Sequence, residues 1–68
     1  MEKGWVNIYS TGRQDLVTIV RELLEENDIA STEVSKKDST FPSISEIEIY
    51  VQEKDAILAQ TLILQHNL

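Results

Sequence analysis

The stretch SEIEIYVQEKDAILAQTLI, residues 45–63, decides the fold of this 68-residue chain. It begins with alternating polar and apolar side chains, which predict a half-buried strand because successive side chains point to opposite faces. Apolar residues then recur at helical spacing, without a proline or glycine between the two patterns. The chain is therefore expected to turn directly from a strand into a helix that covers its apolar face. The expected inward residues are Ile47, Ile49 and Val51 from the strand, and Ala56, Ala59, Leu62 and Ile63 from the helix.

A second strand is predicted near the start of the chain. WVNIYS, residues 5–10, alternates in the same way. Strict alternation would place its six side chains on two faces. Val6, Ile8 and Ser10 are expected on one face, and Trp5, Asn7 and Tyr9 on the other.

Residues 11–27 predict a helix that follows this strand. Thr11 and Gln14 have the spacing of a capping box, in which the hydroxyl accepts a hydrogen bond from a free backbone N–H group. Asn27 and Asp28 can take the left-handed turn that ends a helix. An apolar stripe wide enough to lie on a sheet is formed by Leu16, Ile19, Val20, Leu23 and Leu24.

The segment between the two strand–helix units predicts a weaker strand and a loop. Residues 29–35 alternate but are largely polar, as is typical of a strand at a sheet edge. Residues 36–45 contain Pro42, which has no N–H group to give to a ladder, and several side chains that compete for local backbone hydrogen bonds. On the weak strand, Ala30, Thr32 and Val34 are expected inward, and Ser31, Glu33 and Ser35 outward.

These elements predict an α+β protein with the order β-α-β-β-α. One layer of two helices on one face of a three-stranded sheet satisfies every apolar face. The most apolar strand belongs in the middle, which gives an antiparallel sheet in the order 1-3-2. This is a ferredoxin-like fold that lacks its last strand, in a single domain over residues 1–68 with an ordered core over residues 5–64.

Two segments carry a resemblance to a known family. They are IYSTGRQDLVTIVRELLEENDI, residues 8–29, and EIEIYVQEKDAILAQTLI, residues 46–63. The chain resembles the small bacterial domains described as prokaryotic signal-transducing proteins of unknown function, although Gln52 and Asp28 stand where that family has proline and glycine. The resemblance implies a relation in fold to P-II-type signalling proteins, whose interaction loop lies between the second and third strands. It supplies no catalytic residue and, because the loop here is far shorter, no effector site.

Composition argues against several classes of function. The net charge of −6 opposes binding to nucleic acid and to anionic membrane surfaces, both of which attract basic residues. The chain has no cysteine for redox chemistry or a thiolate metal site. Its first residues lack the apolar run of a signal peptide, so we expect a cytoplasmic protein.

Catalytic and metal-binding groups are sparse. His66 is the single histidine and is expected to be exposed, since no other metal ligand stands near it in the sequence. Glu46 and Glu48, with Glu33 from a neighbouring strand, could hold a cation or exchange protons, but carboxylates on an open sheet face are expected to be solvated. We therefore predict no enzyme, no cofactor and no metal.

Two sets of apolar residues are candidates for an interface. Trp5, Tyr9 and Tyr50 are expected on the helix-free face of the sheet, either as simple cross-strand packing or as a protein contact. On the last helix, the residues outside the inward face include the apolar Ile57, Leu58 and Leu64, and a helix that is apolar on more than one face is usually buried on more than one.

The predicted loop between the second and third strands is a further candidate for partner binding. Its candidate residues are Lys36, Lys37, Phe41 and Pro42, with Phe41 either folded onto the core or exposed as an anchor.

The sequence favours a non-catalytic interaction or regulatory module that self-associates or binds another protein. Either the last helix or the open edge of the first strand could mediate self-association. The alternative is a small-ligand sensor or small enzyme whose site is completed across a subunit interface.

Overall fold

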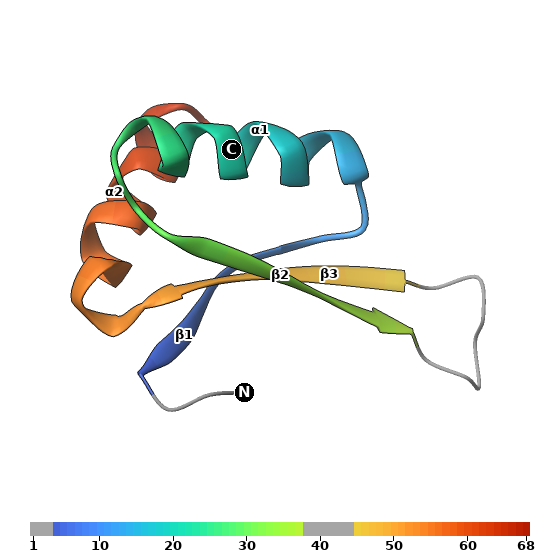
Figure 1. Cartoon of the computed structure of the whole chain (residues 1–68). Helices are drawn as coiled ribbons and strands as arrows, with labels where there is room; N and C mark the ends of the chain where they lie inside the picture. Colours follow the sequence, from blue (N-terminus) through green and yellow to red (C-terminus); the bar gives the residue numbers. More distant parts are fainter. Residues whose placement is uncertain (1–3, 38–44) are drawn as a thin grey trace.

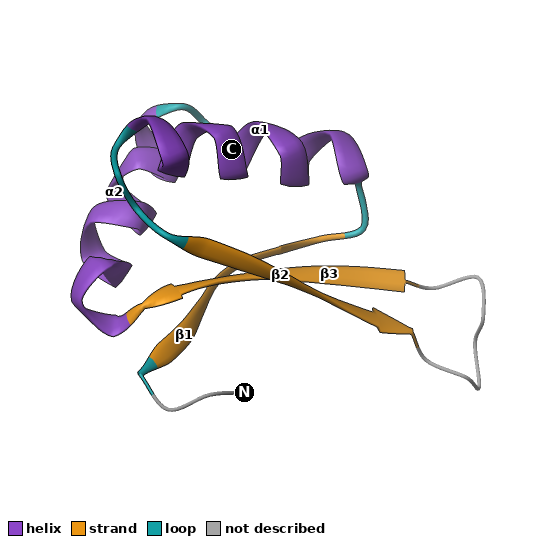
Figure 2. Ribbon diagram, viewed as in Figure 1, coloured by secondary structure: helices purple, strands orange, loops and turns teal. Residues whose placement is uncertain are grey.

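The structure, a computed structural model, describes residues 4–37 and 45–68. Three antiparallel strands form a sheet in the order β1-β3-β2, and both helices lie on one face of it (Figures 1 and 2). The predicted α+β fold, with its element order and strand order, is confirmed. Its elements are β1 (Trp5–Thr11), α1 (Gln14–Glu26), β2 (Ser31–Lys37), β3 (Ser45–Gln52), the single 3-10 turn η1 (Glu53–Asp55) and α2 (Ala56–Gln65).

Strand β3 joins the two halves of the molecule. Ile49 lies opposite Tyr9 of β1 and Glu33 of β2, and is fully buried beneath the helices. Immediately after Gln52, the turn η1 leads the chain into α2, as the junction in the sequence predicts. Leu23, at the edge of the core, is also buried. The central core cluster consists of Val17, Val20, Leu24, Ile29, Ile49, Val51, Ala59 and Ile63.

A β-bulge in β1 corrects the predicted faces of that strand. Asn7 pairs with Tyr50, but Tyr9 pairs with the next residue along β3, Ile49, so that Ile8 is an extra residue. One extra residue resets the alternation. Tyr9 therefore lies on the helix-covered face and Ser10 on the open face, opposite to the prediction. The side-chain amide of Asn7 supports the irregularity, because it donates to the carbonyl groups of Tyr9 (3.1 Å) and Ile49 (3.3 Å).

Strand β2 is inverted relative to the prediction. Ser31 and Glu33 lie opposite the buried Val51 and Ile49, so they face the helices. Thr32 lies opposite Tyr50, on the open face. The prediction was wrong because it took the apolar residues of a polar strand to be the inward ones. Val34, likewise, lies opposite Glu48 on the open face.

Helix α1 is also rotated slightly from its predicted stripe. Val17, which the stripe omitted, is fully buried, whereas Ile19 is 46% exposed. The predicted capping box does not form: the N-cap residue is Arg13, and it makes no side-chain cap. The Thr11 hydroxyl instead accepts a hydrogen bond from the Arg13 N–H group, at 3.2 Å.

Both helices end in the same hydrogen-bonded motif. Asp28 and Asn67 have positive φ angles of 59° and 56°, and the next residue donates its N–H group back into the last helical turn, from Ile29 to Leu24 and from Leu68 to Ile63. This is the Schellman motif, in which an apolar residue after the left-handed position packs against the helix. Ile29 is part of the core cluster and Leu68 packs against it.

Strand β2 lies two residues later in the chain than the strand predicted at residues 29–35. Residues 36, 37 and 45 belong to the paired strands, so the predicted loop at residues 36–45 is shortened at both ends. Phe41 and Pro42 lie outside the described residues. Neither helix in the described part of the chain has the length and hydropathy needed to cross a membrane.

Candidate functional site

Strand β1 and helix α2 form a part of the molecule without charged side chains. All twelve acidic and six basic residues lie outside residues 4–12 and 56–68. These two segments are distant in sequence but contact one another, and Tyr9 links them by donating its hydroxyl hydrogen bond to the Leu68 carbonyl at 3.4 Å. We call the surface formed by β1 and α2 the charge-free side.

Three large apolar side chains are exposed on the charge-free side. Ile57 is 81% exposed, Leu64 is 77% exposed and Leu58 is 49% exposed. All three belong to α2, as the sequence predicted when it assigned that helix a second apolar stripe. Soluble proteins rarely expose contiguous apolar patches without a partner, so this side is the strongest candidate for a contact.

A shallow hollow lies where α2 meets β1. It has a volume of about 250 Å³ and is lined by Ile8, Gln60, Ile63 and Leu64. The bulge contributes to it, because Ile8, the extra residue of β1, lies here. The exposed Leu64 is thus continuous with the first strand, and the two routes to self-association that the sequence left open belong to one surface.

The open face of the sheet is a weaker candidate. The predicted aromatic group of Trp5, Tyr9 and Tyr50 is divided by the bulge: Tyr9 packs against the core on the helix side. Trp5 and Tyr50 remain on the open face and are half-buried. The Tyr50 hydroxyl donates to a Glu48 carboxylate oxygen at 2.9 Å, which indicates packing within the sheet.

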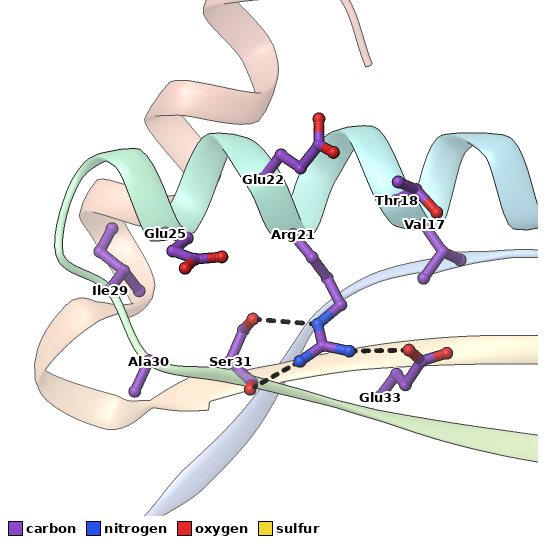
Figure 3. A pocket seen from close by; sticks show the side chains of 9 residues that line it. All are labelled: Val17, Thr18, Arg21, Glu22, Glu25, Ile29, Ala30, Ser31 and Glu33. Atoms are coloured by element: carbon purple, nitrogen blue, oxygen red, sulfur yellow. Dashed lines mark hydrogen bonds and ion pairs between the residues drawn. The ribbon is translucent and has the colours of Figure 1, made fainter.

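A groove with a volume of about 540 Å³ lies between α1 and β2 (Figure 3). Arg21 extends from α1 down to β2, where it donates to the Glu33 carboxylate at 2.7 Å and to the Ser31 hydroxyl at 3.4 Å. Glu22 and Glu25 also line the groove, so carboxylates outnumber the single guanidinium. The guanidinium already has a carboxylate partner, which leaves the groove unsuited to an anionic ligand.

Sequence reasoning missed the Arg21–Glu33 pair. The signal was present, because Arg21 stands four residues after the buried Val17 and three before the buried Leu24, on the inward stripe of α1. An arginine there can cover apolar residues with its stem while its charged end reaches a polar strand. Glu33 on the helix side of β2 is the group that receives it.

The carboxylates proposed as an alternative site do not converge. Glu33 lies on the helix-covered face, whereas Glu48 lies on the open face. Glu46 stands two residues before Glu48 on the same strand and so belongs to the open face as well. Within residues 4–37 and 45–68, no group of three or more potential metal ligands is brought together. His66 is exposed, and its Nδ1 atom lies 2.9 Å from the Leu62 carbonyl oxygen.

The carboxyl group of Asp15 has a lowered pKa. Arg13 donates two hydrogen bonds to Asp15, at 3.2 and 2.8 Å, and these hold the pKa of the Asp15 carboxyl below its usual value. This pair is exposed at the start of α1, away from the charge-free side. It is typical of a solvated helix terminus and does not indicate catalysis.

Comparison with known proteins does not identify a family. The chain matches no family model, no curated protein and no solved structure. The resemblance to small bacterial signal-transducing domains therefore stays a prediction, and function must be argued from the surface of the molecule.

Proposed function

We propose that this chain is a non-catalytic interaction module of the cytoplasm that self-associates through its charge-free side. The observation that carries the proposal is the exposure of Ile57 and Leu64 on a helix without any charged residue. Burial of apolar surface contributes about 25 cal/mol per Å². Most of the surface of these two side chains is exposed, so association that covers it would be favourable.

Electrostatics favours the same side. Two copies that each carry a net charge of −6 repel one another wherever charged surfaces meet. Contact through β1 and α2 brings together two elements that carry no acidic side chain. A chain of this length buries only about 60% of its unfolded surface, so association would also supplement a small core.

A ligand-sensing or catalytic role has less support. It requires convergent polar groups, and the three carboxylates considered for it are divided between the two faces of the sheet. Regulation, as the family resemblance implies, would then act through protein contact, either by changing the oligomeric state or by exchanging one copy for another partner.

Sedimentation equilibrium of the wild type and of Ile57→Lys/Leu64→Lys tests this proposal. The control is Gln14→Lys/Thr18→Lys, which adds the same two charges to exposed positions of α1. We expect the wild type to dimerise at micromolar concentrations, the α2 variant to weaken dimerisation at least tenfold, and the control to change it less than threefold.

Salt dependence provides a second measurement. Because the copies repel at long range, raising NaCl from about 20 to 300 mM should strengthen dimerisation severalfold. A monomeric wild type at tens of micromolar in high salt would refute the proposal. Equal weakening by both double variants would show that the contact is elsewhere.

A further inference from the structure

The backbone of β1 offers hydrogen-bonding groups at a defined position of its outer edge. The Glu53 N–H group donates to the Gly4 carbonyl at 2.7 Å, which makes Gly4 and Glu53 a hydrogen-bonded pair across the sheet. Such pairs alternate with non-hydrogen-bonded pairs in an antiparallel ladder. Trp5, paired with Gln52, and Asn7, paired with Tyr50, are therefore the residues whose N–H and C=O groups point away from β3.

We propose that two copies join through antiparallel pairing of their β1 strands about a two-fold axis at Val6. This inference rests on the proposed function and specifies the contact that carries it. In that register Trp5 of one copy faces Asn7 of the other, so all their outward N–H and C=O groups exchange hydrogen bonds. The three-stranded sheets become one continuous sheet.

The register centred on Val6 keeps the pairing clear of the bulge. A two-fold axis at Asn7 would place Trp5 opposite Tyr9 of the second copy. Tyr9 comes after the bulge and pairs with Ile49, whereas Asn7 pairs with Tyr50. The bulge therefore interrupts the regular alternation of outward backbone groups between Asn7 and Tyr9. An axis at Val6 uses only residues on the same side of the bulge.

Strand pairing also brings the exposed Leu64 close to the interface. A two-fold axis perpendicular to the sheet places both α2 helices on the same face of the joined sheet, above the paired β1 strands. Leu64 and Ile8 border the hollow at this edge, so they lie beside the new contact. A specific dimer needs about 500 Å² from each copy, which is about a tenth of the 4805 Å² surface of this chain.

A second copy is the occupant that the charges favour. A partner of opposite charge would be drawn to the acidic surface of α1, whereas β1 and α2 present no charged side chain to attract one. An identical uncharged surface meets this side without burying an unpaired ion, which would be costly.

Single-cysteine crosslinking tests the pairing directly, because the chain has no cysteine of its own. At the axis, the two copies of residue 6 form a non-hydrogen-bonded pair with Cα atoms about 4.5 Å apart, within the range for a disulfide. Val6→Cys should therefore form a covalent dimer under mild oxidation. The control is Thr32→Cys on the opposite edge strand β2, which is also half-buried. We expect at least tenfold more crosslinking for Val6→Cys.

Val6→Cys could fail to crosslink because the substitution disturbs folding. Amide hydrogen exchange of the unmodified protein tests the same strand pairing without a substitution. The Trp5 and Asn7 N–H groups should exchange more slowly as concentration rises through the dimerisation range. If sedimentation shows a dimer while these amides exchange rapidly and Val6→Cys crosslinks no more than the control, strand pairing is wrong and the self-association proposal stands. If sedimentation shows only monomer, both are wrong.

Discussion

The two edge strands of the sheet differ in charge. β1 carries no charged residue and lies beside α2, which has none either. β2 carries Glu33 and two lysines, and α1 reaches it with Arg21. Charged residues on an edge strand discourage pairing with other chains, because pairing would strip them of water. The comparison indicates one edge kept for solvent and another available for a partner.

Both sides rest on the same core, so the difference lies at the periphery. Val20 and Leu24 of α1 and Ala59 and Ile63 of α2 converge on Ile49. Substitutions in this shared core should destabilise the whole fold, whereas substitutions at the periphery should affect only one of the two sides.

The largest effect is expected from Ile49→Ala. The side chain is fully buried on the central strand, and its truncation removes apolar contacts and leaves a cavity. We expect a loss of about 2–5 kcal/mol in the free energy of unfolding, and about 0.5–1.5 kcal/mol for Ile49→Val. Urea denaturation measures both. A loss below 1 kcal/mol for the alanine variant would mean that the two sides are stabilised separately.

An intermediate effect is expected from glycine at the two helix ends. Asp28→Gly relieves a left-handed backbone conformation and removes a negative charge from the carboxyl end of α1. It should stabilise the protein by about 0.5–1 kcal/mol. Asn67→Gly relieves only the conformation, and asparagine tolerates it well. Thermal unfolding should therefore show a smaller gain for Asn67→Gly, and an equal gain would remove the electrostatic part of this explanation.

A smaller effect is expected from Arg21→Ala. Its ion pair with Glu33 is partly exposed, at 41% and 33% for the two side chains, so solvent screens it. We expect a loss of about 0.5–1 kcal/mol, of which Arg21→Met should retain part because a long stem still covers the core. Chemical denaturation compares the two. Arg13→Ala, in the more exposed pair with Asp15, is the control and should have little effect.

The smallest effect concerns Asp15 and pH. Because Arg13 lowers the pKa of Asp15 in the folded state, the pair stabilises the protein above the unfolded pKa, and this contribution is lost as pH falls through the folded pKa. The relevant range is below about pH 4. The NMR titration midpoint of the Asp15 carboxyl should rise in Arg13→Ala. An unchanged midpoint would mean that these hydrogen bonds do not persist in solution.

The candidate site was partly predictable. The exposure of Ile57 and Leu64 was predictable because the last helix has apolar residues on more than one face. The place of β1 at an edge of the sheet was predictable from the strand order 1-3-2. The hollow that joins them was not predictable. It depends on Ile8, whose position is set by a bulge that no local pattern in the strand reveals.

By itself, the sequence determined the order of the elements, the central place of β3 and the separation of charged from uncharged segments. Each of these depends on local periodicity or composition. Tertiary structure alone decided which way β1 faces after Ile8 and which way β2 faces throughout. The register of a strand with its neighbour decides which side chains face the helices. That register depends on how the core packs and, in β2, agrees with the ion pair between Arg21 and Glu33.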